Sequence, residues 1–231
     1  MRFQQNRLFS FYFLIATTCF LLSSCREKAA LEPPIIVKYL ALGDSYTIGQ
    51  GVDTLDRWPN QLSAQLISNG IEVQKTDIIA QTGWRTSNLL NAIGNTPLDD
   101  YNLISLLIGV NNQFWGEPFD IFQSEFDSLL NITIDLVGKE RLFIVSIPDY
   151  GVTPFGSNNS ENIAEDIDMY NNYIQERCSS EGLAFINITE ISRQLGDSEG
   201  ALASDNLHPS GGQYAKWVEE LFPIVLNLIE G

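Results

Sequence analysis

The apolar residues of this chain fall into two alternating patterns, short continuous runs and longer segments with helical spacing. The short runs are rich in Val, Ile and Leu, which is typical of strands that are covered on both faces. They predict five strands, over residues 35–42, 73–80, 101–108, 142–147 and 183–188. Helical spacing between them predicts helices over residues 57–69, 86–93, 119–137, 163–178 and 213–229, the last kinked at Pro223.

This alternation of strands and helices indicates βαβ units. We therefore predict one α/β domain, a three-layer αβα sandwich around a central five-stranded, mostly parallel sheet. In such a sheet the ligand crevice lies outside the carboxyl ends of the strands. The residues that follow each strand are the first place to search for chemistry.

The first 25 residues resemble an export signal rather than part of the domain. Two arginines precede an apolar run over residues 8–22, which is shorter than the roughly 20 apolar residues that a membrane span needs. The run ends in Leu-Ser-Ser-Cys at Cys25, which resembles the bacterial lipobox and implies cleavage before Cys25 and lipid attachment to it. An uncleaved anchor helix or an ordinary signal peptide is the alternative.

Residues 26–34 form a polar linker that ends in Pro-Pro, and residues 35–231 then make up one domain. Lipid on Cys25 would hold this domain in the bacterial cell envelope, outside the cytoplasm, with the outer membrane as one possible destination. The mature chain would keep one cysteine, Cys178, which excludes an intrachain disulfide and which we interpret as a packing residue.

The charge of the chain limits its partners. It carries 13 Lys and Arg against 29 Asp and Glu, a net charge of −16. Loss of the two signal arginines leaves 11 against 29, or −18. Such an acidic domain argues against binding nucleic acid and against direct attraction to anionic lipid head groups, so we expect membrane contact through the lipid anchor only. We favour a monomer.

The chain contains a single histidine, His208, three residues after Asp205. A proton shuttle at neutral pH must pass through this imidazole. Zinc and non-haem iron sites usually recruit several histidines or cysteines, so we expect no metal and no cofactor. Ser45 follows the first predicted strand in Gly-Asp-Ser, and a serine there becomes a nucleophile when a base takes its proton. Asp205 could hold the tautomer of that base.

Two further strand ends carry groups that could stabilise an oxyanion. Gly83 follows the second strand and offers a backbone N–H, while Asn111 follows the third and offers a side-chain amide. The backbone N–H of Ser45 is a third candidate. Each residue alone is more ordinary as a cap or turn residue. Their conjunction at successive strand ends favours catalysis.

These segments also resemble the four sequence blocks of the GDSL, or SGNH, hydrolase superfamily, over nearly the whole chain from about residue 36. In chain order they are Gly43-Asp44-Ser45, Gly83, Gly109-Val110-Asn111 and Asp205-Asn206-Leu207-His208-Pro209. The resemblance implies a flavodoxin-like fold and metal-free ester hydrolysis through an acyl-enzyme. It implies that Ser45 is the nucleophile, His208 the base and Asp205 its orienting partner, with Ser45, Gly83 and Asn111 as oxyanion donors.

The chain departs from the pattern of that superfamily at two positions. Asn112 stands where many members have Asp, which puts the local support of Asn111 in question. Tyr46 replaces the leucine that follows Gly-Asp-Ser.

The leading hypothesis is a metal-independent serine esterase that acts on a small ester, either an acylated sugar or a lipid. The acidic surface and the Trp-containing loops (Trp84-Arg85 and residues 113–115) slightly favour deacetylation of carbohydrate or envelope glycan. A lysophospholipase or short-chain lipase using the same residues is the first alternative. A non-catalytic, envelope-binding lipoprotein is the second.

Overall fold

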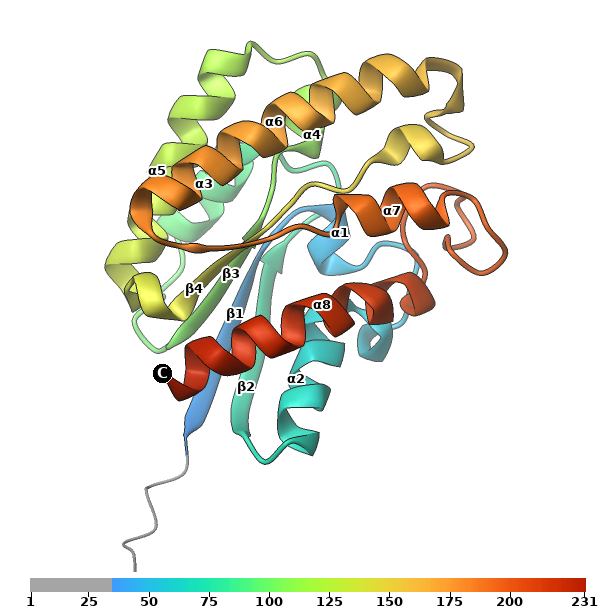
Figure 1. Cartoon of the computed structure of the whole chain (residues 1–231). Helices are drawn as coiled ribbons and strands as arrows, with labels where there is room; N and C mark the ends of the chain where they lie inside the picture. The colour runs from blue at the N-terminus through green and yellow to red at the C-terminus, as the bar shows by residue number, and fades with distance from the viewer. Residues whose placement is uncertain (1–34) are drawn as a thin grey trace, which may run out of the picture. The chain divides into compact units, whose positions relative to one another are not determined.

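The computed structural model describes residues 35–231, and their five strands form one parallel sheet (Figure 1). The sheet order is β2-β1-β3-β4-β5. The strands are β1 (Ile36–Gly43), β2 (Glu72–Ala80), β3 (Leu103–Leu107), β4 (Leu142–Val145) and β5 (Ala184–Ile186). The predicted α/β sandwich is therefore confirmed, and every strand pair in the sheet is parallel. The predictions for the signal, Cys25 and the linker lie outside the described residues.

Helices cover both faces of the sheet (Figure 1). One face carries α2 (Trp58–Ser68) and α8 (Gly211–Glu230), and the other carries α3 (Thr86–Gly94), α5 (Phe119–Val137) and α6 (Ser160–Glu181). All five correspond to predicted helices. α8 continues through Pro223 without ending there.

The burial of each strand follows from its place in the sheet. β3 and β4 lie inside the sheet and all their residues are buried, as expected for parallel strands covered on both sides. β2 lies at one edge, and each of its residues is half-buried or exposed, which allows its polar composition. One pair of buried hydroxyls joins β1 to β3: the Tyr39 hydroxyl lies 2.7 Å from Ser105 Oγ.

The last three strands are shorter than predicted. After β4 and β5, side chains replace part of the sheet hydrogen bonding. The N–H of Ile147 donates to Asn171 Oδ1 at 2.8 Å, and the N–H of Ile188 donates to Ser146 Oγ at 2.8 Å. Both isoleucines remain buried, so the apolar pattern runs past the end of the ladder.

Several short helical elements were not predicted, because a turn of three to seven residues has no readable periodicity. Three are α-helices at the carboxyl edge of the sheet, namely α1 (Ser45–Ile48), α4 (Val110–Phe114) and α7 (Thr189–Leu195). The others are 3₁₀ turns, η1 (Thr54–Asp56), η2 (Lys139–Arg141), η3 (Tyr150–Val152) and η4 (Ser157–Asn159). α1 and α4 begin at or beside predicted site residues, so these omissions concern the site directly.

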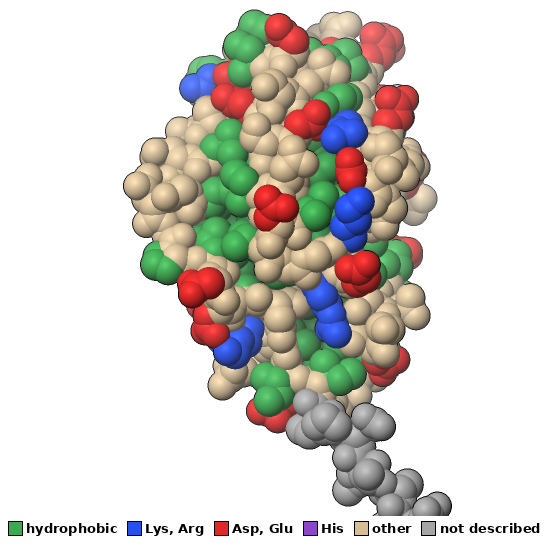
Figure 2. All heavy atoms as spheres, turned by 90° about the vertical axis from the view of Figure 1, so that its left-hand side faces the viewer, with side chains coloured by type: hydrophobic (Ala, Val, Ile, Leu, Met, Phe, Trp, Pro, Cys, Tyr) green, Lys and Arg blue, Asp and Glu red, His purple; other side chains and the backbone are tan. Residues whose placement is uncertain are grey.

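The surface mixes charges of both signs. Figure 2 shows one face on which Lys and Arg side chains lie between Asp and Glu side chains. Pairing of this kind occurs at Asp100, which lies 2.5 Å from Lys38 Nζ and 2.9 Å from Lys75 Nζ. Among the helices of residues 35–231, none has the length and apolar character needed to cross a membrane.

Cys178 is fully buried in α6, as its interpretation as a packing residue requires. Burial raises the pKa of its thiol to about 12. The thiol therefore stays protonated and unreactive at neutral pH.

Candidate active site

The predicted site residues meet in one pocket at the carboxyl edge of the sheet. Ser45 follows β1, Gly83 follows β2, Asn111 follows β3, and His208 lies in the segment between α7 and α8. All four line a cavity of about 140 Å³. Its remaining lining residues are Tyr46, Thr82, Val110, Phe114, Tyr150, Phe155 and Leu207.

Ser45 is placed by the residue before it. Asp44 caps α1: its Oδ1 accepts the N–H of Tyr46 at 3.0 Å, and its backbone carbonyl accepts the N–H of Ile48 at 2.9 Å. Ser45 thus becomes the first residue of a tight turn, 4% exposed, at the wall of the pocket. Asp44 itself is fully buried, and this burial raises the pKa of its carboxyl to about 7.

His208 and Asp205 form a close pair within a single turn. His208 Nδ1 lies 2.7 Å from Asp205 Oδ2, and Asp205 Oδ1 accepts the N–H groups of Leu207 and His208, both at 3.0 Å. Asn206 adopts a φ of 57°, a left-handed conformation that Asn tolerates and that closes the turn.

These contacts decide the protonation of Asp205. Burial acts to raise the pKa of its carboxyl, but the hydrogen bonds from His208 and Leu207 outweigh burial and hold it below its ordinary value. An ionised Asp205 accepts the Nδ1 proton of His208, which leaves Nε2 unprotonated and able to act as a base.

The loop that carries His208 is fixed on two sides. The N–H of Ala203 donates to the His208 carbonyl at 2.8 Å, and Leu202 forms an antiparallel bridge with Pro209. The Tyr46 ring packs against the imidazole, with ring centroids 5.6 Å apart. The imidazole is therefore held by its partner carboxylate, by its backbone and by an aromatic neighbour.

Gly83 occupies a turn that requires its backbone conformation. The N–H of Trp84 donates to the Gln81 carbonyl at 3.1 Å, and Gly83 has a φ of +84°. A four-residue turn with a positive φ at its third position favours glycine. A Cβ at Gly83 would meet no atom within 4 Å, so conformation rather than space demands glycine here.

Asn111 lies in the first turn of α4, behind Gly109. Gly109 has a φ of +132°, and a Cβ at this position would come within 2.8 Å of both Ile147 and Phe122, so the turn before Asn111 requires glycine. The Asn111 Nδ2 donates to the Trp84 carbonyl at 2.9 Å. This bond ties Asn111 to the loop of Gly83, and the second N–H of the amide remains for a ligand.

Asn112 is fully buried and joins the same two loops. Its Oδ1 accepts the N–H of Thr86 at 3.2 Å, and its Nδ2 donates to Thr86 Oγ1 at 2.7 Å and to the Glu117 carboxylate. Glu117 also pairs with Arg85, with Nη1 and Oε1 3.0 Å apart. An aspartate at 112 would have no N–H for Glu117, so Asn at this position is matched to Glu117. The local support of Asn111 is therefore provided by a different set of partners.

The sequence did not reveal the apolar wall of the pocket. The Phe114 ring lies 6.1 Å from Tyr150 and 5.8 Å from Phe155, centroid to centroid. The Tyr150 hydroxyl donates to Gln113 Oε1 at 2.9 Å. Tyr150 and Phe155 belong to the irregular segment after β4, where no periodic pattern could mark them.

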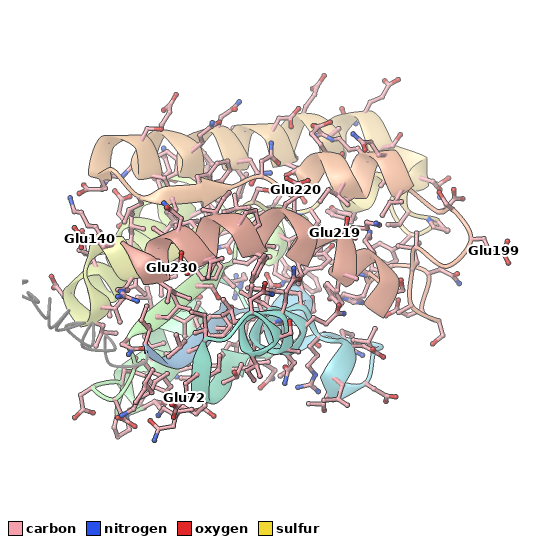
Figure 3. The ribbon with its side chains drawn as sticks, turned by 60° about the horizontal axis from the view of Figure 1, so that its bottom comes forward. Glu72, Glu140, Glu199, Glu219, Glu220 and Glu230 are labelled. Carbon is pink, nitrogen blue, oxygen red and sulfur yellow. The ribbon has the colours of Figure 1, made fainter. Side chains whose placement is uncertain are left out.

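The acidic side chains of the described residues do not converge on a metal site. Within residues 35–231, no cluster of three or more His, Cys, Asp or Glu side chains could hold an ion. Figure 3 labels six exposed glutamates, three of them along α8 and the others on β2, on η2 and in the segment between α7 and α8. The six are Glu72, Glu140, Glu199, Glu219, Glu220 and Glu230.

Comparison with known proteins gives a family match and a set of structures with the same fold. A sequence model of the GDSL-like lipase/acylhydrolase family matches residues 41–216. No curated protein matches the chain closely enough to count as a relative.

Three of the similar solved structures illustrate the range of activities on this fold. The structure of TesA has a TM-score of 0.67 at 17% identity and covers 83% of this chain and 99% of its own. An acetyl xylan esterase from Geobacillus stearothermophilus has a TM-score of 0.62 at 18% identity, covering 82% and 94%. A phospholipase A1 from Streptomyces albidoflavus has a TM-score of 0.62 at 19% identity, covering 83% and 98%. At these identities the likeness concerns the fold.

Proposed function

The chain belongs to the GDSL-like lipase/acylhydrolase family and is an ester-bond hydrolase, and from this premise we propose that it cleaves carboxylic esters through an acyl-enzyme on Ser45. The observation that carries the proposal is the His208–Asp205 pair, 2.7 Å apart, in the same pocket as Ser45, Gly83 and Asn111. These residues supply what the reaction needs: Ser45 as nucleophile, His208 as base with Asp205 behind it, and the N–H groups of Ser45, Gly83 and Asn111 as three oxyanion donors.

In the first half of the reaction, Ser45 Oγ attacks the ester carbonyl carbon while His208 Nε2 takes its proton. Ionised Asp205 stabilises the imidazolium that forms. The oxyanion accepts hydrogen bonds from the backbone N–H groups of Ser45 and Gly83 and from the remaining N–H of Asn111 Nδ2. When the intermediate collapses, the carbon–oxygen bond to the alcohol breaks, and the alcohol leaves with the proton from His208.

In the second half, His208 takes a proton from water, and the hydroxide attacks the acyl-enzyme carbonyl. Collapse of that intermediate releases the acid and returns the proton to Ser45. No step uses a metal.

The pocket wall favours a short, apolar acyl group. Phe114, Tyr150, Phe155 and Leu207 supply mainly carbon surface. A cavity of about 150 Å³ is large enough for benzene, and this pocket of about 140 Å³ must also take the reacting carbonyl beside Ser45, so it suits a short acyl group.

We further propose that lipid on Cys25 anchors the enzyme in the cell envelope, outside the cytoplasm. The sequence around Cys25 supports this location. Mass spectrometry of the purified protein tests it: the wild-type chain is expected to begin at an acylated Cys25, and Cys25→Ala is expected to keep the apolar run over residues 8–22 and to carry no acyl group. A wild-type chain that keeps its first 24 residues, or that carries no acyl group, would contradict the anchor.

Labelling with a fluorophosphonate tests the nucleophile. At neutral pH the wild-type chain is expected to take one adduct at Ser45, and Ser45→Ala is expected to take none. The exposed Ser128→Ala is the matched control and should label like the wild type. An adduct elsewhere, or none, would refute the assignment. Loss of ester hydrolysis in EDTA would show that a metal takes part.

A further inference from the structure

A second depression lies against the active-site pocket, and Gly83 forms part of both walls. The second depression has a volume of about 300 Å³ and is lined by Gly83, Arg85, Asn88 and Trp115. The first is mainly apolar, whereas the second offers a guanidinium, an amide and an indole. The two hollows therefore differ in chemistry and meet at a proposed oxyanion donor.

This arrangement separates the two halves of an ester. With the carbonyl oxygen at the Gly83 N–H, the acyl and alcohol groups leave the carbonyl carbon in different directions. The apolar pocket takes the acyl group. We propose that the second depression binds the alcohol portion of the substrate and that this alcohol is a sugar ring. The inference rests on the proposed esterase function.

Arg85 is fixed in place before any ligand arrives. One of its terminal nitrogens, Nη1, pairs with Glu117, whose side chain is 12% exposed and which Asn112 holds in turn. The Arg85 side chain is 40% exposed and carries five N–H donors, so it has donors beyond the one that meets Glu117. A pre-organised guanidinium loses less entropy when it binds a hydroxyl or ring oxygen.

Asn88 adds a second donor at the same place. Its Oδ1 accepts the N–H of Arg85 at 3.0 Å, which fixes the orientation of the amide. Its Nδ2 is the atom that can donate to a ligand. Arg85 and Asn88 together offer directed donors for the oxygen atoms of a polyol.

Trp115 supplies a flat apolar surface beside these donors. It is 67% exposed, which is unusual for so large a side chain. Its ring meets Phe114 edge to face, with centroids 5.1 Å apart at 79°. Phe114 lies in α4 and lines the pocket proposed for the acyl group, so this contact orients the indole relative to that pocket. An exposed indole beside hydrogen-bond donors fits a ring with both C–H and hydroxyl faces.

The charge of the depression favours a neutral sugar over a phosphate. Arg85 is the one cation that lines it, and Glu117 balances that charge. A phosphate would need an excess of positive charge, usually a bidentate arginine free for it. Trp84, the neighbouring indole in the sequence, packs against the core instead and does not line the depression.

The test compares three butyrate esters that differ only in their alcohol. They are ethyl butyrate, a methyl pyranoside carrying one butyryl ester, and a butyryl glycerophosphocholine. Acid release gives kcat and KM for the wild type, Trp115→Ala, Trp115→Phe and Arg85→Gln. Arg141→Gln, in η2, is the control for loss of an arginine, and thermal melting checks that each variant folds.

For Trp115→Ala and Arg85→Gln, the ratio of kcat/KM on the pyranoside ester to that on ethyl butyrate is expected to fall at least tenfold, mainly through KM. Trp115→Phe should recover part of this ratio, and Arg141→Gln should match the wild type. An unchanged ratio in wild-type-like folded variants would overturn the subsite. A fall confined to the glycerophosphocholine ester would overturn the sugar. Failure of the wild type on all three esters would overturn the esterase proposal itself.

Discussion

Asn112→Asp most directly tests how the loops that carry Gly83 and Asn111, the proposed oxyanion donors, are held together. The fully buried amide donates to Thr86 Oγ1 and to Glu117, and aspartate can do neither. Thr86 Oγ1 already donates its one proton to Glu125 Oε2 at 2.5 Å. Aspartate at 112 would therefore face two acceptors, one of them a carboxylate.

The size of the effect follows from the charges. Two like charges about 4 Å apart repel by about 4 kcal/mol at an effective dielectric constant of about 20. The two lost donor contacts add about 1 kcal/mol each. Because one of the two carboxyls can take a proton, we expect a loss of about 3–5 kcal/mol in the free energy of unfolding at pH 8. The loss should shrink toward pH 5, since repulsion raises the pKa of one carboxyl and its protonation removes the repulsion.

Denaturant unfolding at pH 8 and pH 5 measures both quantities. Asn131→Asp, an exposed position on α5, adds the same charge and is the control, with an expected change within about 0.5 kcal/mol. Asn112→Asp with Glu117→Gln restores one donor contact and removes the like charge, so it should recover more than half of the stability. Asn112→Asp should also lower kcat on short esters, because it loosens Asn111 from the Gly83 loop. A single variant as stable and active as the wild type would refute the described contacts.

Three other expectations address the site. His208→Ala should abolish turnover of a short ester, as no second histidine exists in the chain, while Asp205→Asn should lower kcat less because the base remains; an active His208→Ala near neutral pH would contradict the assignment. Gly83→Ala should lower the free energy of unfolding by about 1–2 kcal/mol, because alanine disfavours the left-handed φ of this position. It should also lower kcat/KM at least tenfold, because it disturbs an oxyanion donor, and both quantities are measured on the purified variant. Burial raises the pKa of the Asp44 carboxyl from 3.8 to about 7. Between these two pH values the folded state holds a proton that the unfolded state has lost. The free energy of unfolding therefore falls as pH rises through this window, by at most ~4 kcal/mol. Asp44→Asn should remove this slope and be more stable than the wild type at pH 8; an unchanged slope in urea unfolding between pH 4 and pH 8 would count against it.

The long elements could be predicted because their length makes the periodicity readable. All five strands and the five long helices lie where the apolar pattern places them, and the rule for strand ends pointed to Ser45 and Asn111. The short helices that hold those two residues have four and five residues. Their conformation comes from local contacts, such as the Asp44 cap and the crowding at Gly109, rather than from a repeat of apolar positions.

The parts of the site that were missed depend on contacts between distant segments. In the sequence, Asn in place of Asp at 112 put the local support of Asn111 in question, but the structure shows that Asn112 is bonded to Thr86 and Glu117. Trp84 and Trp115 looked equivalent in the sequence, although one packs on the core and the other is 67% exposed. Such differences are set by tertiary packing, which single-sequence patterns do not encode.

The sheet order explains why the proposed nucleophile and oxyanion donors fall together. β1 lies between β2 and β3, so the chain turns to opposite sides of β1 in its first two crossovers. The crevice at such a switch point opens between the loops that leave the neighbouring strands. Ser45 follows β1, Gly83 follows its neighbour β2 and Asn111 follows its other neighbour β3. Gly83 follows the exposed edge strand, so its loop has sheet neighbours on one side only. The bonds from Asn111 to the Trp84 carbonyl and from Asn112 to Thr86 supply the missing restraint. The rigidity of the proposed oxyanion site therefore depends on those bonds. For this reason a change at the buried Asn112 is expected to affect catalysis, although Asn112 does not line the pocket.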